Sequence, residues 1–182
     1  ISKDKHLVRL QKENMTPQIY DLAKVSPLLV NLGLNPVNLV TLVDSFDLSI
    51  HQKFKPDSAK QINIICCDAG IYMPNNYFDD TVTTHDKKSA IQSIVDLSAE
   101  VDRRKKLSSN NLNKELPVFC YINDLSELAT KDTLGDLQNI LVHGCDTRVY
   151  VIAVTGNKLS PVMRANFQSV ITFKTETKTE RS

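Results

Sequence analysis

The sequence has 182 residues, of which 41% are hydrophobic and 24% charged, and this size and composition fit one globular domain with a hydrophobic core. Its 22 lysines and arginines almost balance 21 aspartates and glutamates, for a net charge of +1. That balance gives no electrostatic basis for binding nucleic acid or an anionic membrane, and no apolar run is long enough to span a bilayer.

The ends of the chain predict a fragment. It starts at Ile1 instead of Met and finishes in a charged tail of threonine, lysine and glutamate. We therefore expect a single domain over residues 1–182 that is cut from a larger, multidomain protein.

Six runs have the length of β-strands, and most are nearly continuous in apolar residues. Such runs are typical of strands in a parallel sheet that helices cover on both faces. The runs are residues 18–22, 27–32, 61–67, 117–122, 148–154 and 169–173. We expect 27–32 and 117–122 to be inner strands of the sheet.

Three segments between these runs show helical periodicity, namely residues 36–50, 86–107 and 132–143. Asn35 is the expected N-cap of the first, with Pro36 at a position that needs no backbone N–H. The third stops at Gly144, a residue type that commonly ends helices. Strands that alternate with helices predict an α/β fold with a mostly parallel sheet.

The second helical segment carries the longest apolar stripe and a basic last turn. Arginines and lysines at 103–106 favour a helix C-terminus through its dipole. The polar, asparagine-rich stretch 108–115 that follows is expected to be a surface loop. The stripe consists of Ala90, Ile91, Ile94, Val95, Ser98 and Val101.

The four cysteines are Cys66, Cys67, Cys120 and Cys145, and none forms a C-x-x-C pair. We interpret them as buried thiols of a reducing cytosol. A zinc site would need a ligand cluster that the sequence lacks, so no metal site is predicted.

The first inner strand, its turn and the following helix have the layout of a phosphate-binding loop. The full motif also needs glycines for a tight nest, a lysine for the phosphates and a hydroxyl for Mg²⁺. Here only Gly33 remains, and the preceding strand places Asn38 at the lysine position and Leu39 at the hydroxyl position. If Gly33 sets the register instead, Leu39 and Val40 take these positions, and neither register supplies a cation or a hydroxyl. Asn35 lies in the same turn, and Pro36 removes a backbone donor. These positions predict a degenerate nucleotide-binding turn. Judged by the motif alone, the turn is an ordinary connection between a strand and a helix.

The second inner strand ends in the pair Asn123-Asp124, the place of the two acids of a Walker B motif. The first acid normally holds Mg²⁺ and the second positions the attacking water. Asn123 at the Mg²⁺ position brings no negative charge, and Asp124 at the catalytic-base position is shorter than the usual glutamate. The structural alternative is that both residues cap the turn into a short helix.

Thr155 and Asn157 follow the strand 148–154. P-loop ATPases often place a polar sensor of the γ-phosphate there, so these two residues are the candidate sensor positions. An ordinary turn uses the same residue types, and both interpretations stay open.

Four segments together resemble FtsK/SpoIIIE-type ATPase domains. T-H-D at 84–86 with E-V-D-R-R at 100–104 is similar to that family's V-T-D…E-M-E-R-R segment. Residues 117–128 resemble P-x-x-V-V-I-D-E-L-A-D-L, 137–154 resemble its helix, glycine and strand, and 164–173 resemble K-A-N-x-P-x-R-I-A-F. The opening N-M-T-P-Q-I-Y-D-L at 14–22 is similar to the lead-in of ATPase domains in type VII secretion coupling proteins of the EssC/EccC kind.

This resemblance implies a RecA-like P-loop fold, and a degenerate C-terminal ATPase domain of a membrane-anchored hexamer. It also implies a place on the cytoplasmic face of the cell membrane, with the fragment itself soluble. The implied partners are helical-hairpin secreted substrates, neighbouring ATPase domains and other subunits, with no nucleic acid. Active relatives use ATP and Mg²⁺; the substitutions at Asn38, Leu39 and Asn123 lead us to expect no cofactor and no hydrolysis here.

Three alternatives remain. One is an enzyme that still binds ATP weakly, using an arginine from a neighbour. Another is a DNA-translocating motor, against which the near-neutral charge and the missing lysine argue. The last is a flavodoxin-like or receiver-like domain, but a receiver needs clustered acids and Asp68 stands without them.

Overall fold

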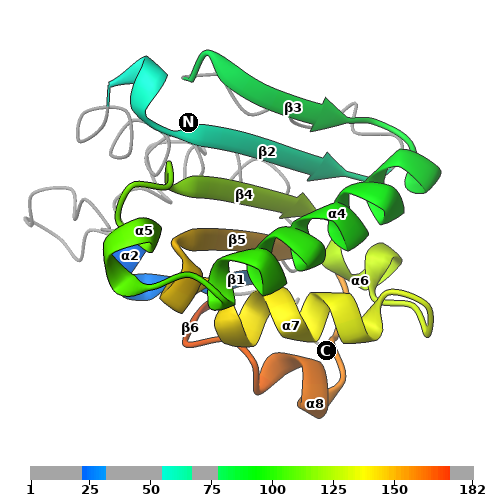
Figure 1. Ribbon diagram of the computed structural model, residues 1–182. Helices are drawn as coiled ribbons and strands as arrows, with labels where there is room; N and C mark the ends of the chain where they lie inside the picture. Colours follow the sequence, from blue (N-terminus) through cyan, green and yellow to red (C-terminus); the bar gives the residue numbers. More distant parts are fainter. Residues whose placement is uncertain (1–21, 32–54, 67–77, 173–182) are drawn as a thin grey trace, which may run out of the picture.

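The computed structural model describes residues 22–31, 55–66 and 78–172 (Figure 1). The strands are β1 (Leu28–Asn31), β2 (Lys60–Ile65), β3 (Asp80–Thr84), β4 (Val118–Asn123), β5 (Val149–Thr155) and β6 (Ser169–Thr172). The helices are α2 (Leu22–Val25), α4 (Lys87–Lys105), α5 (Ser109–Leu112), α6 (Leu125–Leu128), α7 (Leu134–His143) and α8 (Pro161–Arg164), with 3-10 turns η1 (Pro56–Ser58) and η2 (Cys145–Thr147).

The strands form one six-stranded sheet in the order β3-β2-β4-β5-β1-β6, and every pair is parallel. The predicted α/β class and parallel sheet are therefore confirmed. β1 and β4 each have neighbours on both sides, as their apolar sequences predicted. Their side chains are buried up to the last residue of each strand, because a parallel sheet is covered on both faces.

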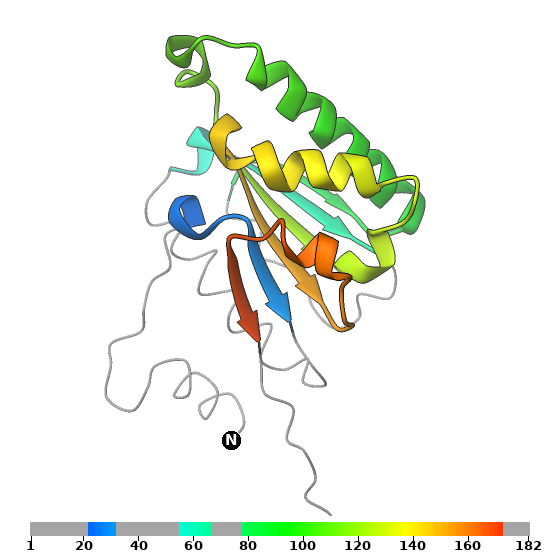
Figure 2. The ribbon, with the colours of Figure 1, turned by 90° about the horizontal axis from the view of Figure 1, so that it is seen from below.

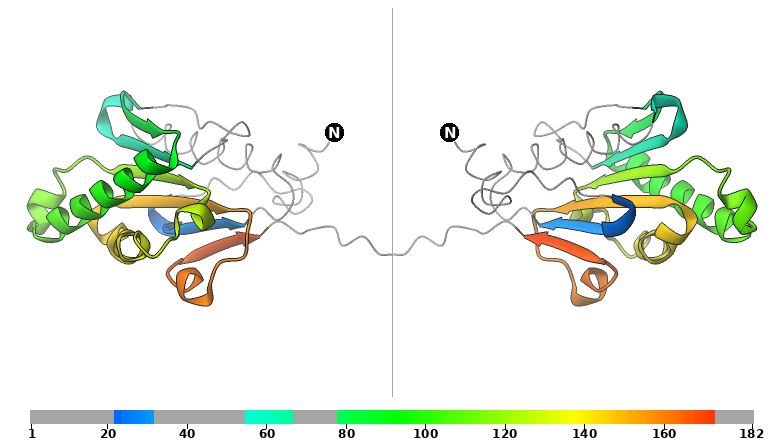
Figure 3. Two further views of the ribbon diagram at one scale, coloured as in Figure 1. Left: turned by 90° about the vertical axis from the view of Figure 1, so that its right-hand side faces the viewer. Right: turned by 90° about the vertical axis from the view of Figure 1, so that its left-hand side faces the viewer.

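Helices α4 and α7 lie side by side over one face of the sheet (Figure 2). Alternate residues of β4 and β5 point to this face. The hydrophobic core there contains Ile94, Leu97 and Val101 of α4, Leu137, Ile140 and Leu141 of α7, Val118, Cys120 and Ile122 of β4, and Val149, Val151 and Ala153 of β5. Helix α8 adds Met163 to the same core, next to the end of the sheet that β1 and β6 form (Figure 3).

The opposite face carries an aromatic stack. Phe119 lies between Phe78 and Tyr150, with ring centroids 5.7 and 5.5 Å apart. Because Phe119 sits between Val118 and Cys120 in β4, its ring must point away from α4. Offset stacks of this kind add to the free energy gained from burial alone.

The apolar stripe of α4 differs from the predicted one. Ala90, Ile94 and Val101 are buried as expected, but Val95 is 39% exposed and Ile91 only partly buried. Their places are taken by Leu97 and Arg104. A helix of 3.6 residues per turn that faces the core through Ala90, Ile94 and Val101 also turns position 97 inward.

Helix α4 begins and ends close to where the sequence predicted. Asp86 is its N-cap and accepts hydrogen bonds from Ser89 N at 3.0 Å and Ser89 Oγ at 2.6 Å. These two bonds lower the pKa of the Asp86 carboxyl. The bonds satisfy donors that a helix N-terminus otherwise leaves open.

Several sequence predictions need correction or cannot be placed. β3 was not predicted, because an edge strand reading D-T-V-T-T has little apolar content. The expected loop 108–115 contains the short helix α5. Leu22, expected in a strand, lies in α2. The rest of that run, the helical segment 36–50 and Cys67 lie outside the described residues.

In the described part of the chain, no helix has the length and apolarity needed to cross a membrane.

Candidate functional site

The parallel sheet brings the predicted Walker B and sensor positions to one edge. β4 and β5 are neighbours that run in the same direction, so both end at the same edge of the sheet, with Asn123 opposite Val154. β1 ends there too, with Asn31 opposite Thr155. In open α/β sheets, ligands bind at this carboxyl edge.

Both carboxylate oxygens of Asp124 are occupied by protein donors. Asp124 is the N-cap of α6, and its Oδ1 accepts hydrogen bonds from Ser126 N and Ser126 Oγ, each at 2.9 Å. Its Oδ2 accepts one from Gly156 N at 3.0 Å, which joins the end of β4 to the turn after β5. Asp124 therefore caps the turn into a short helix, which confirms the structural alternative for this residue.

Thr155 and Asn157 close a local turn after β5. Thr155 Oγ1 donates to Asn157 O at 2.8 Å and accepts from Asn157 N at 3.2 Å. Asn157 Nδ2 donates to Ser126 Oγ at 3.2 Å, so the turn is also tied to α6. Thr155 is buried and Asn157 exposed. In this arrangement the two candidate sensor residues bond to each other and to the Asp124 cap.

Asn123 is the last residue of β4 and is partly buried. Its backbone oxygen accepts a hydrogen bond from Cys66 N at 2.6 Å, next to the end of β2, and the Asn123–Asp124 peptide is cis. An amide at this position can accept a hydrogen bond from a metal-bound water but carries no charge to attract the metal. Within the described ranges, no group of three histidine, cysteine, aspartate or glutamate side chains could hold a metal ion.

The degenerate Walker A positions Gly33, Asn35, Asn38 and Leu39 lie outside the described residues, so they remain sequence predictions. The structure adds two residues that the sequence analysis missed, Ser126 and Gly156. The spacing Asp124-x-Ser126 is typical of a side-chain cap and could have predicted the first. Nothing local predicts Gly156, because its contact with Asp124 spans two strands.

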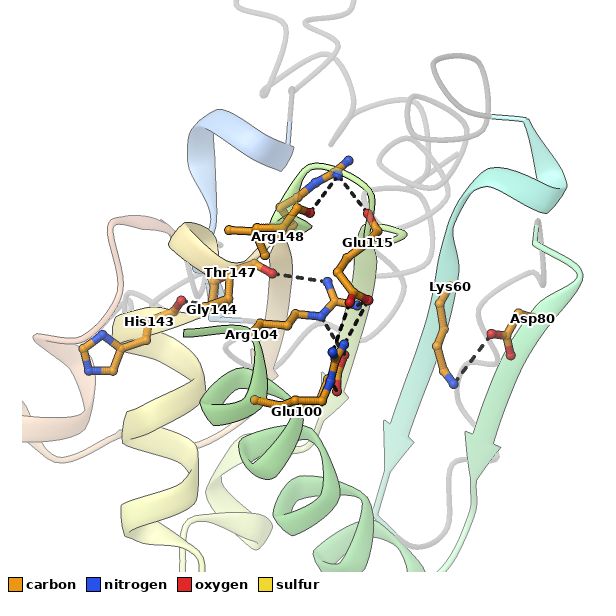
Figure 4. Close-up of polar contacts among 11 residues, drawn as sticks. Lys60, Asp80, Glu100, Arg104, Glu115, His143, Gly144, Thr147 and Arg148 are labelled. Atoms are coloured by element: carbon orange, nitrogen blue, oxygen red, sulfur yellow. Dashed lines mark hydrogen bonds and ion pairs between the residues drawn. The ribbon is translucent and has the colours of Figure 1, made fainter. Parts of the chain in front are cut away.

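A second polar cluster lies at the opposite, amino-terminal edge of the sheet (Figure 4). Arg104, at the end of α4, is only 4% exposed although it belongs to a run of four basic residues. Its Nε lies 2.6 Å from Glu100 Oε1, and its Nη1 donates to Thr147 O at 3.2 Å. Nη2 lies 3.9 Å from Glu115 Oε2. A buried arginine needs such partners for its charge.

Glu100 is the centre of this cluster. It pairs with Arg104 and also with Arg103, whose Nε lies 2.7 Å from Glu100 Oε2. Hydrogen bonds from Arg103, and then from Arg104, lower the pKa of the Glu100 carboxyl to about 2 against the opposing effect of burial. Glu115 supplies the second carboxylate of the cluster, and its Oε2 lies 2.9 Å from Arg103 Nη2. Two arginines and two glutamates thus form a cluster without net charge.

Arg148 fixes the loop beside this cluster (Figure 4). Its backbone has φ 62°, in the left-handed region. Its Nη1 donates to Asn113 O at 2.7 Å and Glu115 O at 2.8 Å, which holds the segment between α5 and β4. The arginines of this edge are therefore committed to protein acceptors, and the cluster joins α4, α5, β4 and β5.

No protein-family model matches the sequence, and a search of curated proteins finds no match. Solved structures do match. The cytoplasmic domain of the Thermomonospora curvata type VII secretion ATPase EccC has a TM-score of 0.61 at 16% identity, over 80% of this chain and 18% of that one. EssC (ATPases 2 and 3) from Geobacillus thermodenitrificans has a TM-score of 0.62 at 14% identity, over 86% and 33%. A further structure of the cytoplasmic domain of EssC has 0.61 at 15%, over 89% and 35%.

These structures share the fold of this chain, and the expected structural resemblance to EccC and EssC ATPase domains is confirmed. The RecA-like α/β class is confirmed with it. The chain spans 18–35% of the length of these three structures.

Proposed function

We propose that this chain is an ATPase-like domain of a membrane-anchored type VII secretion motor. In this proposal it recognises substrates or regulates export by protein contacts and does not hydrolyse ATP itself. It acts at the cytoplasmic face of the membrane, within a hexamer that contains further ATPase domains. The structural similarity to EccC, a type VII secretion ATPase, and to ATPases 2 and 3 of EssC supports this setting.

One observation carries the absence of hydrolysis. Asp124 stands at the place of the catalytic base. Its Oδ1 accepts hydrogen bonds from Ser126, and its Oδ2 accepts one from Gly156. A general base must be within hydrogen-bonding reach of the proton it accepts, and these bonds direct the Asp124 carboxylate toward α6 and the turn after β5. Asn123 beside it supplies no charge for Mg²⁺. The capping role of Asp124 and the missing charge at Asn123 together support the proposal that the domain does not hydrolyse ATP.

The partners of such a domain are proteins. We propose that it binds helical-hairpin secreted substrates and the neighbouring ATPase domains of the same motor, without a need for nucleotide. Contacts of this kind place a few apolar side chains of the partner in a groove between elements. The near-neutral charge of the chain is compatible with this mode. Affinity for an isolated domain is expected to be weak, and a hexamer raises it by avidity.

The competing function is weak ATP binding completed by a neighbour's arginine. It keeps the fold and the secretion setting but makes the domain a nucleotide-dependent switch. The strand, turn and helix that the sequence predicts around Gly33 favour it over the DNA-translocating alternative, because only the latter also requires a basic surface.

Two measurements on the 182-residue chain test the proposal. Calorimetry with Mg-ATP is expected to give no binding at micromolar to millimolar nucleotide, since each lost charge-assisted contact removes about 1.5–3 kcal/mol. A pull-down with helical-hairpin substrates, or with the adjoining ATPase domain, is expected to succeed equally with and without Mg-ATP. A micromolar dissociation constant for Mg-ATP contradicts the loss of the site. Capture only in the presence of nucleotide supports the competing function.

A further inference from the structure

An open cleft lies between α4 and the edge of the sheet formed by β2 and β3. Its volume is about 360 Å³, at the lower end of the range of about 300–1,000 Å³ for binding pockets. Leu97 and Val118 form its buried floor, and Ile62 and Val82 form its wall along the two strands. We call this space the α4–β3 cleft.

The cleft exists because the sheet is wider than the helical layer above it. Val118 on β4 is 1% exposed, Ile62 on β2 is partly buried, and Val82 on β3 is 41% exposed. Val82 pairs in register with Ile62, and Val118 pairs with Lys60, which lies two positions before Ile62 on the same face of β2. Apolar surface therefore continues from the core to the solvent along one face of the sheet.

The charges around the cleft are almost all compensated (Figure 4). Lys60 pairs with Asp80 at 3.6 Å, and Arg104 pairs with Glu100 at 2.6 Å. Asp96 on α4 is the exception. It is exposed and accepts a hydrogen bond from Gln92 at 2.8 Å, but it has no ion pair among the described residues. The apolar cleft thus has one uncompensated negative charge at its rim.

The outer side of β3 has no neighbouring strand in the described part of the chain. Among the described strands β3 pairs only with β2, at the end of the sheet. An extended segment added beside it would gain main-chain hydrogen bonds and would turn every second side chain toward α4. Val82 and Asp96 both line the cleft, so side chains of such a segment that point toward α4 would face an apolar residue and a carboxylate.

We propose that the α4–β3 cleft is a docking site for an extended segment of a partner protein, in which an aliphatic residue and a lysine or arginine are separated by one residue. The aliphatic side chain fills the space between Leu97 of α4 and Val82 of β3, and the basic side chain pairs with Asp96. This inference rests on the proposed function in one respect only, that the domain acts through protein contacts. The charge complementarity at Asp96 determines the sign of the partner's charge.

The test uses the ¹⁵N-labelled chain and the probe peptide acetyl-Thr-Leu-Thr-Lys-Thr-amide, titrated at millimolar concentration and followed by amide chemical shifts. Matched control peptides replace Leu by Asp, or Lys by Glu. The expected result is a saturable shift confined to residues of the cleft, with the Leu/Lys peptide bound more tightly than both controls. No shift, or shifts outside the cleft, overturns the proposal. Shifts of cleft residues on concentration of the protein alone identify a second copy as the occupant and overturn it too.

Two pairs of variants sharpen the test. Val82→Asp is expected to weaken binding of the Leu/Lys peptide about tenfold, whereas the same change at Val142, which is 52% exposed on α7, leaves it unchanged. Asp96→Lys is expected to reverse the preference toward the Leu/Glu peptide, whereas Asp132→Lys, an exposed position outside the cleft, does not. Because Asp96 is exposed, this second pair remains informative if Val82→Asp fails to fold.

The outcomes separate this inference from the proposed function. If substrates are captured by the chain and by Val82→Asp and Asp96→Lys alike, the proposed function stands and the docking site is wrong. If the peptide binds in the cleft but no substrate or adjoining domain is captured, the docking site stands and the proposed function is wrong.

Discussion

Arg104 reaches from the last turn of α4 to the loop before β5, where its Nη1 donates a hydrogen bond to the backbone oxygen of Thr147 at 3.2 Å. The same guanidinium holds Glu100 of α4 at 2.6 Å. Thr147 in turn donates its hydroxyl to Gly144 O at 2.9 Å. One buried cation therefore joins the two helices that cover the sheet to the strand beneath them, and it is part of the core of the domain.

We expect Arg104→Ala to lower the free energy of unfolding by about 1–3 kcal/mol, because the buried Thr147 carbonyl loses this donor and the core loses a packed side chain. Glu100 keeps its pair with Arg103. Urea unfolding followed by circular dichroism measures the change. Arg103→Ala is the matched control. Arg103 contacts the same Glu100 but is half exposed, so its loss should cost much less. Equal losses for the two variants would contradict the assigned role of Arg104.

The stability of the domain should depend on pH through Glu100. Its pKa is lowered from 4.5 to about 2 in the folded protein by hydrogen bonds from Arg103 and then Arg104. A lowered pKa stabilises the fold fully above pH 4.5 and loses that contribution as the pH falls toward 2. The difference in unfolding free energy between the natural chain and Glu100→Gln should therefore shrink between pH 5 and pH 2. Glu127→Gln, which removes an exposed carboxylate elsewhere, controls for net charge.

Two glycines in and after α7 should respond in opposite directions to alanine. A Cβ at Gly144 would overlap the backbone oxygen of Ile140 and lie 2.8 Å from Val149 O, whereas a Cβ at Gly135 meets nothing within 4 Å. Gly144→Ala is expected to destabilise the protein by about 1–3 kcal/mol. Gly135→Ala, inside the helix, is expected to stabilise it by about 0.5–1 kcal/mol. Melting temperatures check both, and a stable Gly144→Ala protein would exclude the close approach of Val149.

Asp124 should matter for folding and not for catalysis. Asp124→Ala removes the cap of α6 and the bond to Gly156, for an expected loss of about 1–2 kcal/mol in the free energy of unfolding. Glu127→Ala, on the same short helix and exposed, should have little effect. Unfolding curves measure the loss, and phosphate release assays should show no ATPase activity before or after the change. Activity that disappears with Asp124 would assign it a catalytic role.

Restoring one Walker B acid should not restore an enzyme. Asn123→Asp supplies the missing charge at the Mg²⁺ position, but Asn38 and Leu39 still replace the lysine and the hydroxyl of the phosphate-binding turn. We expect no phosphate release from Mg-ATP by this variant at any protein concentration. Hydrolysis by Asn123→Asp alone would mean that the turn around Gly33 retains a working phosphate site.

Much of the fold could be predicted because its signals are local. β1, β4 and β5 are apolar up to a polar last residue, a pattern typical of buried parallel strands. α4 carries its cap and its basic last turn in adjacent residues. β3 escaped prediction because an edge strand does not need to be apolar. Gly144 was correctly placed at a helix end. Its φ is −58°, outside the left-handed region, and close backbone atoms are what exclude a side chain there.

The candidate site shows the same division. The sequence alone determined that Asn123 cannot supply a charge and that Asp124 follows a buried strand, because residue identity and strand pattern suffice for both. Only the tertiary structure decided three further relationships. Asp124 Oδ2 accepts a hydrogen bond from Gly156, and Arg104 is buried against Thr147. Val82 and Asp96 border one cleft. Those pairs are 32, 43 and 14 residues apart in the chain. Contacts over such separations follow from the order of strands in the sheet and the helix packed upon it, which no local pattern encodes.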